Sequence, residues 1–214
     1  MARLYDPDAF ITKTGFAIRF VENRCLRRTR RALDGGPTRD TLDLGCGAGN
    51  LIERLDGGRL VGVDLSETML NQARRRLAAR PAVEFVKANA EALPFPEGSF
   101  GRVVCSEVLE HVLDPRMVVA EIRRVCLPGA RVVFTVPNEG LINATKRVVV
   151  ALGLKRAIAG EYPMSDDVLD AWHLSQITEA WLDGACAGRF VPAGRWGVPS
   201  SLLPYHRILA FDAS

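Results

Sequence analysis

The chain has 214 residues, of which 48% are hydrophobic and 25% are charged, and its formal net charge is +3. A chain of this length and composition can bury one large core, which predicts a single globular domain. The net charge is too small to favour a nucleic-acid partner, so none is expected. No apolar run approaches the length of a membrane span, and the residues after Met1 lack the apolar core of a signal peptide. The sequence therefore predicts a cytoplasmic protein.

Helical and strand patterns alternate along the chain. In chain order they predict a helix from about Asp8 to Leu33, a strand at 41–45, a helix at 48–56, a strand at 59–64, a helix at 66–80, strands at 83–87 and 100–105, a helix from Asp114-Pro115 to Leu127, and a strand at 131–136. This alternation predicts a parallel sheet with helices on both faces. Two more strands are expected near Phe190 and at 207–211. No clear helix separates them, so they should be antiparallel.

A glycine-rich loop follows the first predicted strand. Gly45, Gly47 and Gly49 occupy alternate positions, and Gly45 and Gly47 can adopt backbone angles closed to other residues, which lets the main chain approach a ligand. The next strand ends at Asp64, where dinucleotide-binding folds place the acid that accepts from ribose hydroxyls. A tight turn without any ligand is the alternative interpretation. A nicotinamide-binding loop would require its third glycine at position 50, which is Asn50.

Five motifs, taken together, resemble those of the class I S-adenosylmethionine-dependent methyltransferases. They are 42–49 (LDLGCGAG), 61–66 (VGVDLS), 89–95 (NAEALPF), 106–112 (SEVLEHV) and 127–130 (LPGA), and the similarity is close over about residues 38 to 140. The resemblance implies an α/β fold, a Rossmann-like three-layer sandwich whose mostly parallel seven-stranded sheet has an antiparallel last strand. It also implies one methyltransferase domain over 1–214, with an N-terminal helical cap at 1–37 and a lid-like insertion at 138–174.

The resemblance further implies S-adenosylmethionine as cofactor and O-methylation of a small hydrophobic or acidic acceptor. Asp43 would accept from the cofactor's ammonium group, Asp64 from its ribose hydroxyls, and Leu65 would offer apolar surface to the adenine. The backbone amides of the glycine loop would face the methionine part. Where the family has an Asp-Ala pair at the adenine edge, this chain has Asn89-Ala90, which removes a charge. The expected cofactor-binding residues are Asp43, Gly45, Cys46, Gly47, Gly49, Asp64, Leu65, Asn89, Ala90 and Ser106.

The segment after the strand at 100–105 is the candidate for catalysis, because open α/β sheets bind ligands at the carboxyl ends of their strands. In a helical turn, Glu107, Glu110 and His111 would share one face. They could then bind a divalent metal ion, or His111 and Glu107 could deprotonate an acceptor hydroxyl. The alternative is that Glu110 and His111 only orient each other and the loop. His173 and His206 are weaker candidates.

Two basic segments mix cations with apolar residues. The first, from Lys13 to Arg31, has seven cations and one acid, Glu22, and the second spans 144–158. Basic amphipathic helices can lie on anionic membranes, and the second segment is placed like the membrane-touching segment of the ubiquinone-biosynthesis O-methyltransferases. Peripheral membrane contact is therefore one expectation. A solvated face, or a lid over an acidic soluble substrate, is the other.

Two further functions are weighed against the methyltransferase interpretation. A nucleic-acid or protein N-methyltransferase of the Asn/Asp-Pro-Pro-Tyr type would show that string at 105–108, where this chain has Cys-Ser-Glu-Val. A module that binds S-adenosylmethionine without catalysis satisfies the same binding motifs. Five cysteines, an odd number without metal-type spacing, are expected to be reduced residues, most of them in the core: Cys25, Cys46, Cys105, Cys126 and Cys186.

Overall fold

One seven-stranded sheet organises the chain in a computed structural model that describes residues 15–80, 82–154 and 174–214. The strands are β1 (Thr41–Leu44), β2 (Leu60–Asp64), β3 (Val83–Lys87), β4 (Phe100–Ser106), β5 (Cys126–Pro137), β6 (Phe190–Pro199) and β7 (Pro204–Ala213). Their order is β3-β2-β1-β4-β5-β7-β6. β7 pairs antiparallel with both β5 and β6, and the other neighbouring pairs are parallel. The predicted sheet with a reversed last strand is confirmed.

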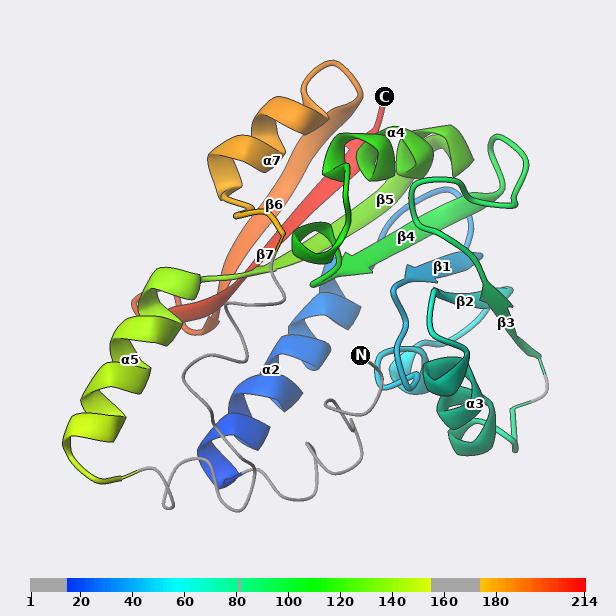
Figure 1. Ribbon diagram of the computed structural model, residues 1–214. Helices are drawn as coiled ribbons and strands as arrows, with labels where there is room; N and C mark the ends of the chain where they lie inside the picture. Colours follow the sequence, from blue (N-terminus) through cyan, green and yellow to red (C-terminus); the bar gives the residue numbers. More distant parts are fainter. Residues whose placement is uncertain (1–14, 81, 155–173) are drawn as a thin grey trace.

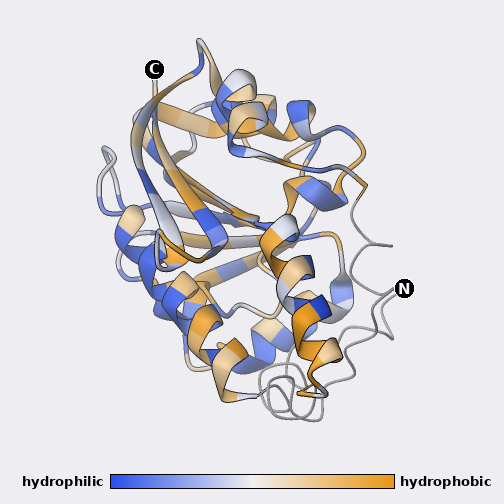
Figure 2. Cartoon of the chain, turned by 90° about the vertical axis from the view of Figure 1, so that its left-hand side faces the viewer, coloured by the Kyte–Doolittle hydropathy of each residue, from blue (hydrophilic) through white to orange (hydrophobic). Residues whose placement is uncertain are grey.

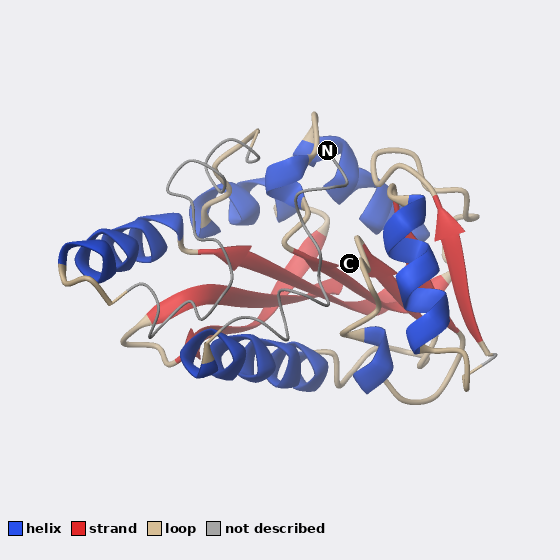
Figure 3. Cartoon of the chain, turned by 60° about the horizontal axis from the view of Figure 1, so that its bottom comes forward, coloured by secondary structure: helices blue, strands red, loops and turns tan. Residues whose placement is uncertain are grey.

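Helices cover both faces of this sheet (Figures 1 and 3). They are α2 (Phe16–Ala32), α3 (Glu67–Arg76), α4 (Pro115–Val125), α5 (Glu139–Ala151), α7 (Glu179–Cys186) and two 3₁₀ helices, η1 (Ile52–Arg54) and η2 (Leu109–His111). α4 and α7 pack on one face, and α2 and α3 pack on the other. This arrangement is the predicted three-layer sandwich.

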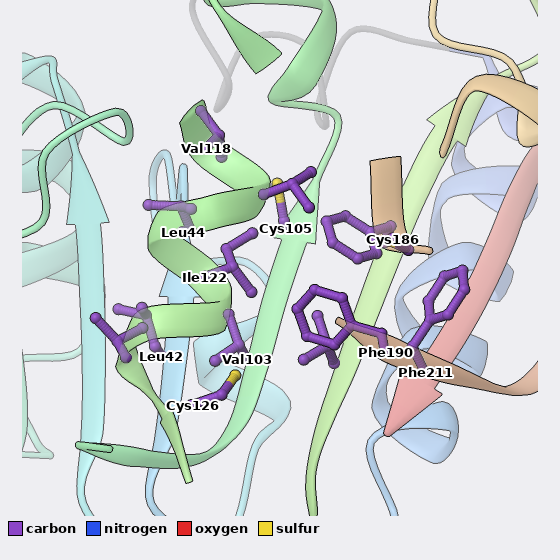
Figure 4. Close-up of a cluster of buried hydrophobic side chains, with 14 of the residues drawn as sticks. Leu42, Leu44, Val103, Cys105, Val118, Ile122, Cys126, Cys186, Phe190 and Phe211 are labelled. Atoms are coloured by element: carbon purple, nitrogen blue, oxygen red, sulfur yellow. The ribbon is translucent and has the colours of Figure 1, made fainter. Parts of the chain in front are cut away.

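Alternation along the strands divides the buried side chains between two cores. In β4, Val103 and Cys105 point to the core under α4 and α7, whereas Val104 belongs to the core on the opposite face. Figure 4 shows Val118 and Ile122 of α4 packed over Leu42 and Leu44 of β1. A fully buried apolar side chain of this size is worth about 1.5–3 kcal/mol relative to exposure. All five cysteines are free and buried, as predicted.

The predicted helix at 48–56 is wrong. The chain forms turns there and only the three-residue η1. Gly49, with φ of +80°, interrupts the helical backbone, and Gly57 and Gly58 follow with left-handed φ angles. The Arg80 guanidinium donates to three backbone carbonyls of this segment, those of Ile52, Glu53 and Leu55, which stabilises it without a longer helix.

Smaller differences concern the helix ends and the predicted lid. Asp114 caps α4 as predicted, accepting from the backbone N–H groups of Arg116 and Met117, but α4 ends at Val125 because β5 begins at Cys126. α5 occupies the beginning of the predicted lid, 138–174. Residues 1–14 and 155–173, which include His173 and the beginning of the predicted N-terminal cap, lie outside the described residues. None of the described helices combines the length and apolar character that a bilayer crossing requires.

Candidate cofactor and acceptor site

The candidate site lies at the carboxyl edge of the parallel strands. β1, β2 and β4 end side by side there, in the register Leu44 beside Val63 and Leu44 beside Cys105. β7 runs in the opposite direction and begins at the same edge, where His206 pairs with Pro137 at the end of β5. The topology therefore brings the glycine loop, the strand ends and the start of β7 to one edge, the usual ligand-binding edge of open α/β sheets.

The three glycines of the loop have different surroundings. Gly45, Gly47 and Gly49 have φ angles of +73°, +51° and +80°, so all three have left-handed backbones. A Cβ atom on Gly45 would lie 2.2 Å from Val108 Cγ2, and one on Gly49 would lie 3.1 Å from Leu77 Cδ1. A Cβ atom on Gly47 would meet no heavy atom within 4 Å. Gly45 and Gly49 thus allow close packing, whereas Gly47 borders open space.

The backbone amides of this loop bond within the protein. Gly45 N and Cys46 N both donate to Val63 O, at 2.7 and 2.9 Å, and Gly49 N donates to Cys46 O at 2.9 Å. Gly47 N donates to Asp64 Oδ2 at 2.9 Å. Four of the five amides that were expected to face a ligand, those of Gly45, Cys46, Gly47 and Gly49, thus have acceptors within the protein. The end of β2 lies close enough to the loop for Val63 and Asp64 to accept hydrogen bonds from its amides.

Two acids beneath the loop have acceptor capacity. Asp64 also accepts from Ser66 N through Oδ1, but an ionised carboxylate has about four lone-pair sites, so both oxygens can accept further bonds. Asp43 is 2% exposed, and its Oδ2 has no hydrogen-bond partner among the described residues. Burial, reinforced by the charge of Asp64, raises the pKa of Asp43 to about 7. A buried acceptor without a donor, near open space at Gly47, fits a ligand with hydroxyl or ammonium donors.

The other predicted cofactor residues have varied environments. Leu65 is 68% exposed beside Asp64, and Cys46 is buried in the core under α2 and α3. Asn89 is exposed, and its amide bonds to Glu91, while Ala90 packs against the core under α4. Ser106 Oγ lies 2.6 Å from Thr135 Oγ1. Leu65 thus offers exposed apolar surface at the edge, while Asn89 is already engaged in a local turn.

A histidine between two glutamates occupies the other half of the edge. His206, at the start of β7, is 7% exposed. Its Nδ1 lies 2.5 Å from Glu107 Oε1 and its Nε2 lies 3.6 Å from Glu22 Oε1 of α2. The closer contact is an ion pair without the alignment of a good hydrogen bond. Glu107 has φ of +53°, the one left-handed backbone of a residue other than glycine in the described part of the chain.

The charges of this cluster determine its protonation. Burial alone would lower the pKa of His206, but the carboxylates of Glu107 and Glu22 outweigh it and raise the pKa to about 9. Burial and the charge of Glu107 raise the pKa of Glu22 to about 7, although the charge of His206 opposes them. His206 is therefore an imidazolium at neutral pH, and it stabilises the Glu107 carboxylate.

Glu110 and His111 have different surroundings from one another. Glu110 is 1% exposed, and neither of its carboxyl oxygens has a partner among the described residues. Burial and the charge of Glu107 raise its pKa to about 8. His111 is exposed on η2. The sequence predicts a helical turn with the three side chains on one face. The backbone instead is left-handed at Glu107 and forms a 3₁₀ turn at η2.

The metal hypothesis for Glu107, Glu110 and His111 is not supported. Across residues 15–80, 82–154 and 174–214, no group of three or more His, Cys, Asp or Glu side chains is arranged to hold a metal ion. From sequence, His206 is one of the weaker candidates and Glu22 has no predicted role. The predicted reversal of the last strand could have indicated a role for His206, because a reversed strand begins at the carboxyl edge of its parallel neighbours.

Comparisons with known proteins agree with this fold and motif order. Residues 42–134 match the family model described as a methyltransferase domain. The chain is 36% identical to the demethylmenaquinone methyltransferase of Clavibacter sepedonicus, over 67% of this chain and 63% of that protein. It is also 36% identical to the ubiquinone biosynthesis O-methyltransferase of Methylococcus capsulatus, over 73% and 65%. Residues 42–134 therefore form a methyltransferase domain, and its fold and motif order are those of the class I S-adenosylmethionine-dependent methyltransferases.

A solved structure extends the likeness of the fold beyond the matched domain. N-methyltransferase NodS from Bradyrhizobium japonicum, in complex with S-adenosyl-L-homocysteine, superposes with a TM-score of 0.65 at 18% identity, covering 99% of this chain and 95% of that one. At this identity the similarity concerns the fold alone. The chain spans less than two thirds of the length of the curated relatives that it matches.

Proposed function

We propose that the protein transfers a methyl group from S-adenosylmethionine to an oxygen atom of a small hydrophobic or acidic acceptor. The open space at Gly47, beside the Asp64 carboxylate, is the observation that supports this most strongly. The family match adds to it, and so do the quinone-pathway names of two relatives and the S-adenosyl-L-homocysteine bound to NodS. The acceptor would enter at the same edge, on the side of Glu107.

Three residues would hold the cofactor. Asp64 would accept from its ribose hydroxyls, Asp43 from its ammonium group, and Leu65 would contact its adenine. Bound S-adenosylmethionine supplies an electrophilic methyl group on a positively charged sulfur. Most of the rate enhancement would then come from holding the acceptor in line with that group, as in other reactions that depend on orientation.

Glu107 is the proposed proton acceptor, and His206 is its positioning residue. Because His206 is protonated at neutral pH, it cannot take a proton from the acceptor hydroxyl there. A Glu107 carboxylate oxygen would take that proton, while the ion pair with His206 Nδ1 fixes the orientation of the side chain. His111, the candidate from sequence, remains a second possibility to be tested beside Glu107.

Product analysis tests this function. The purified protein would be incubated with S-adenosylmethionine and a panel of phenols, catechols and hydroxyquinols, with and without isoprenoid tails. We expect S-adenosyl-L-homocysteine to form together with one acceptor that gains a methyl group on oxygen. Methylation at carbon or nitrogen would contradict the O-methylation. Tight cofactor binding without turnover across the panel would favour a non-catalytic binding module.

We also propose a cytoplasmic location with peripheral membrane contact through α5. Figure 2 shows hydrophobic residues along this helix. Val148 and Val150 are 57% and 39% exposed, and Leu152 just after the helix is 65% exposed, near Lys146 and Arg147. Apolar side chains flanked by cations can bind an anionic bilayer surface. Val148→Ser/Leu152→Ser should reduce co-sedimentation with phosphatidylglycerol vesicles. Equal sedimentation of the variant and the wild type would contradict the proposal.

A further inference from the structure

A basic hollow lies between α2 and the end of β6, apart from the residues assigned to the cofactor and the acceptor. Its volume is about 340 Å³. Four arginines of α2 line it: Arg24, Arg27, Arg28 and Arg31. Their spacing of three and four residues places them on one face of the helix. Trp196 and the turn at 197–201 form the opposite wall.

Two of the arginines are anchored to that wall. Arg24 Nε donates to the carbonyl of Pro199 at 2.7 Å. The Arg28 guanidinium lies 5.0 Å from the centre of the Trp196 ring, in a cation–π contact. Arg27 and Arg31 make no side-chain contact of this kind with the described residues. Contacts with the wall thus fix Arg24 and Arg28, and we expect the guanidinium groups of Arg27 and Arg31 to contact a ligand.

The positive charge of the hollow is not compensated within the described part of the chain. No Asp or Glu there forms an ion pair with any of the four arginines, whereas Arg30 on the same helix pairs with Asp56. Arg24 and Arg28, and likewise Arg27 and Arg31, are like charges four residues apart, an arrangement that destabilises a helix. An anion in the hollow would relieve this repulsion.

We propose that this hollow binds a terminal phosphate group, either a phosphomonoester or a pyrophosphate. Guanidinium groups donate pairs of parallel hydrogen bonds to phosphate oxygens, and several of them around one anion select high negative charge. The group could belong to a soluble phosphorylated molecule or to the headgroup of phosphatidic acid. The hollow adjoins the proposed acceptor half, because its lining residue Val198 pairs with His206 in the sheet, but none of its four arginines is assigned to the cofactor or the acceptor.

Calorimetric titration of the whole protein with inorganic pyrophosphate, at low ionic strength, tests the site. We expect saturable binding by the wild type and a loss of affinity of about tenfold or more in Arg27→Gln/Arg31→Gln, because two charge-assisted contacts are removed. Arg19→Gln, a change on the same helix outside the hollow, should bind as the wild type does. Pyrophosphate should raise the unfolding temperature of the wild type and not that of the double variant. Without ligand, the double variant should unfold at no lower a temperature than the wild type.

A vesicle arm distinguishes the two sources of phosphate. Co-sedimentation that is stronger with phosphatidic acid than with phosphatidylglycerol vesicles, with this difference lost in the double variant, would assign the site to a lipid headgroup. Binding of pyrophosphate without any preference for phosphatidic acid would assign it to a soluble ligand. The proposal is overturned if the wild type binds neither probe, or if the double variant binds both as the wild type does. Titration of the same samples with S-adenosylmethionine reports separately on the methyltransferase proposal.

Discussion

The two halves of the carboxyl edge are built in different ways. The half proposed for the cofactor is local, because the glycine loop bonds to the end of the next strand, Gly47 N to Asp64 and Gly45 N to Val63. The half proposed for the acceptor joins Glu22, Glu107 and His206, which come from α2, the residue after β4 and the start of β7. A local site can be detected as a sequence motif. A site assembled from distant elements depends on the topology of the sheet.

The largest expected effect is on the acceptor half. Glu107→Gln should lower turnover by about 10²–10⁴-fold, the usual contribution of a positioned base, and leave cofactor affinity nearly unchanged. Single-turnover kinetics with the methylated acceptor, together with cofactor titration, measure the two effects separately.

His111→Ala is the matched comparison. If Glu107 is the proton acceptor, this variant should keep most of its turnover, because the exposed imidazole of His111 on η2 would then take no proton from the acceptor. His206→Gln should lose turnover through misplacement of Glu107, with an altered pH profile. A large loss in His111→Ala with full activity in Glu107→Gln would reverse the assignment in favour of the sequence-based candidate.

The next effect concerns the cofactor half. Asp64→Ala should weaken S-adenosylmethionine binding by about 2–4 kcal/mol, because a charged acceptor of two hydroxyl groups is lost. Asp34→Ala, which changes an exposed acid outside the site, is the control for calorimetry. Unchanged affinity in Asp64→Ala would remove the ribose role of this residue.

A smaller effect is expected when Gly47 and Gly49 of the loop are each replaced by alanine. Gly47→Ala and Gly49→Ala both place a side chain on a left-handed backbone, but only the second meets Leu77 and Ala73. We expect Gly49→Ala to lose about 1–3 kcal/mol more stability through overpacking, measured by denaturant unfolding. Gly47→Ala should instead weaken cofactor binding. Equal losses of stability would contradict the difference in packing, and unchanged cofactor affinity in Gly47→Ala would contradict a functional role for the open space.

The smallest effect is the pH dependence of stability. The folded-state pKa of His206, about 9, exceeds its ordinary value of 6.5, so its stabilising contribution is complete below about pH 6.5 and is lost as the pH rises through 9. The pKa of Glu110, raised from 4.5 to about 8, acts in the same direction, with its contribution lost as the pH rises through 8. Thermal unfolding should therefore move to lower temperature between pH 6.5 and 9, and less so in Glu110→Gln. A rise in stability over this interval would contradict both assignments.

The sequence predicted most of the sheet because apolar strands alternate with helices, and the resemblance to the family implied seven strands with an antiparallel last one. The helix at 48–56 failed because two local rules conflict there: the helical spacing of the apolar residues and the left-handed backbone of Gly49. The metal cluster failed for a related reason, since the backbone at Glu107 turns away from a helix. The pairing of Glu22 with His206 depends on how α2 packs against β7, which periodicity does not indicate.

A crystal structure with S-adenosyl-L-homocysteine would show whether the two halves of the edge serve one reaction. We expect the ligand beside Gly47, with its ribose hydroxyls at the Asp64 carboxylate and its sulfur facing the side of the edge where Glu107 and His206 lie. A ligand bound elsewhere, or one whose sulfur faces away from Glu107, would contradict it.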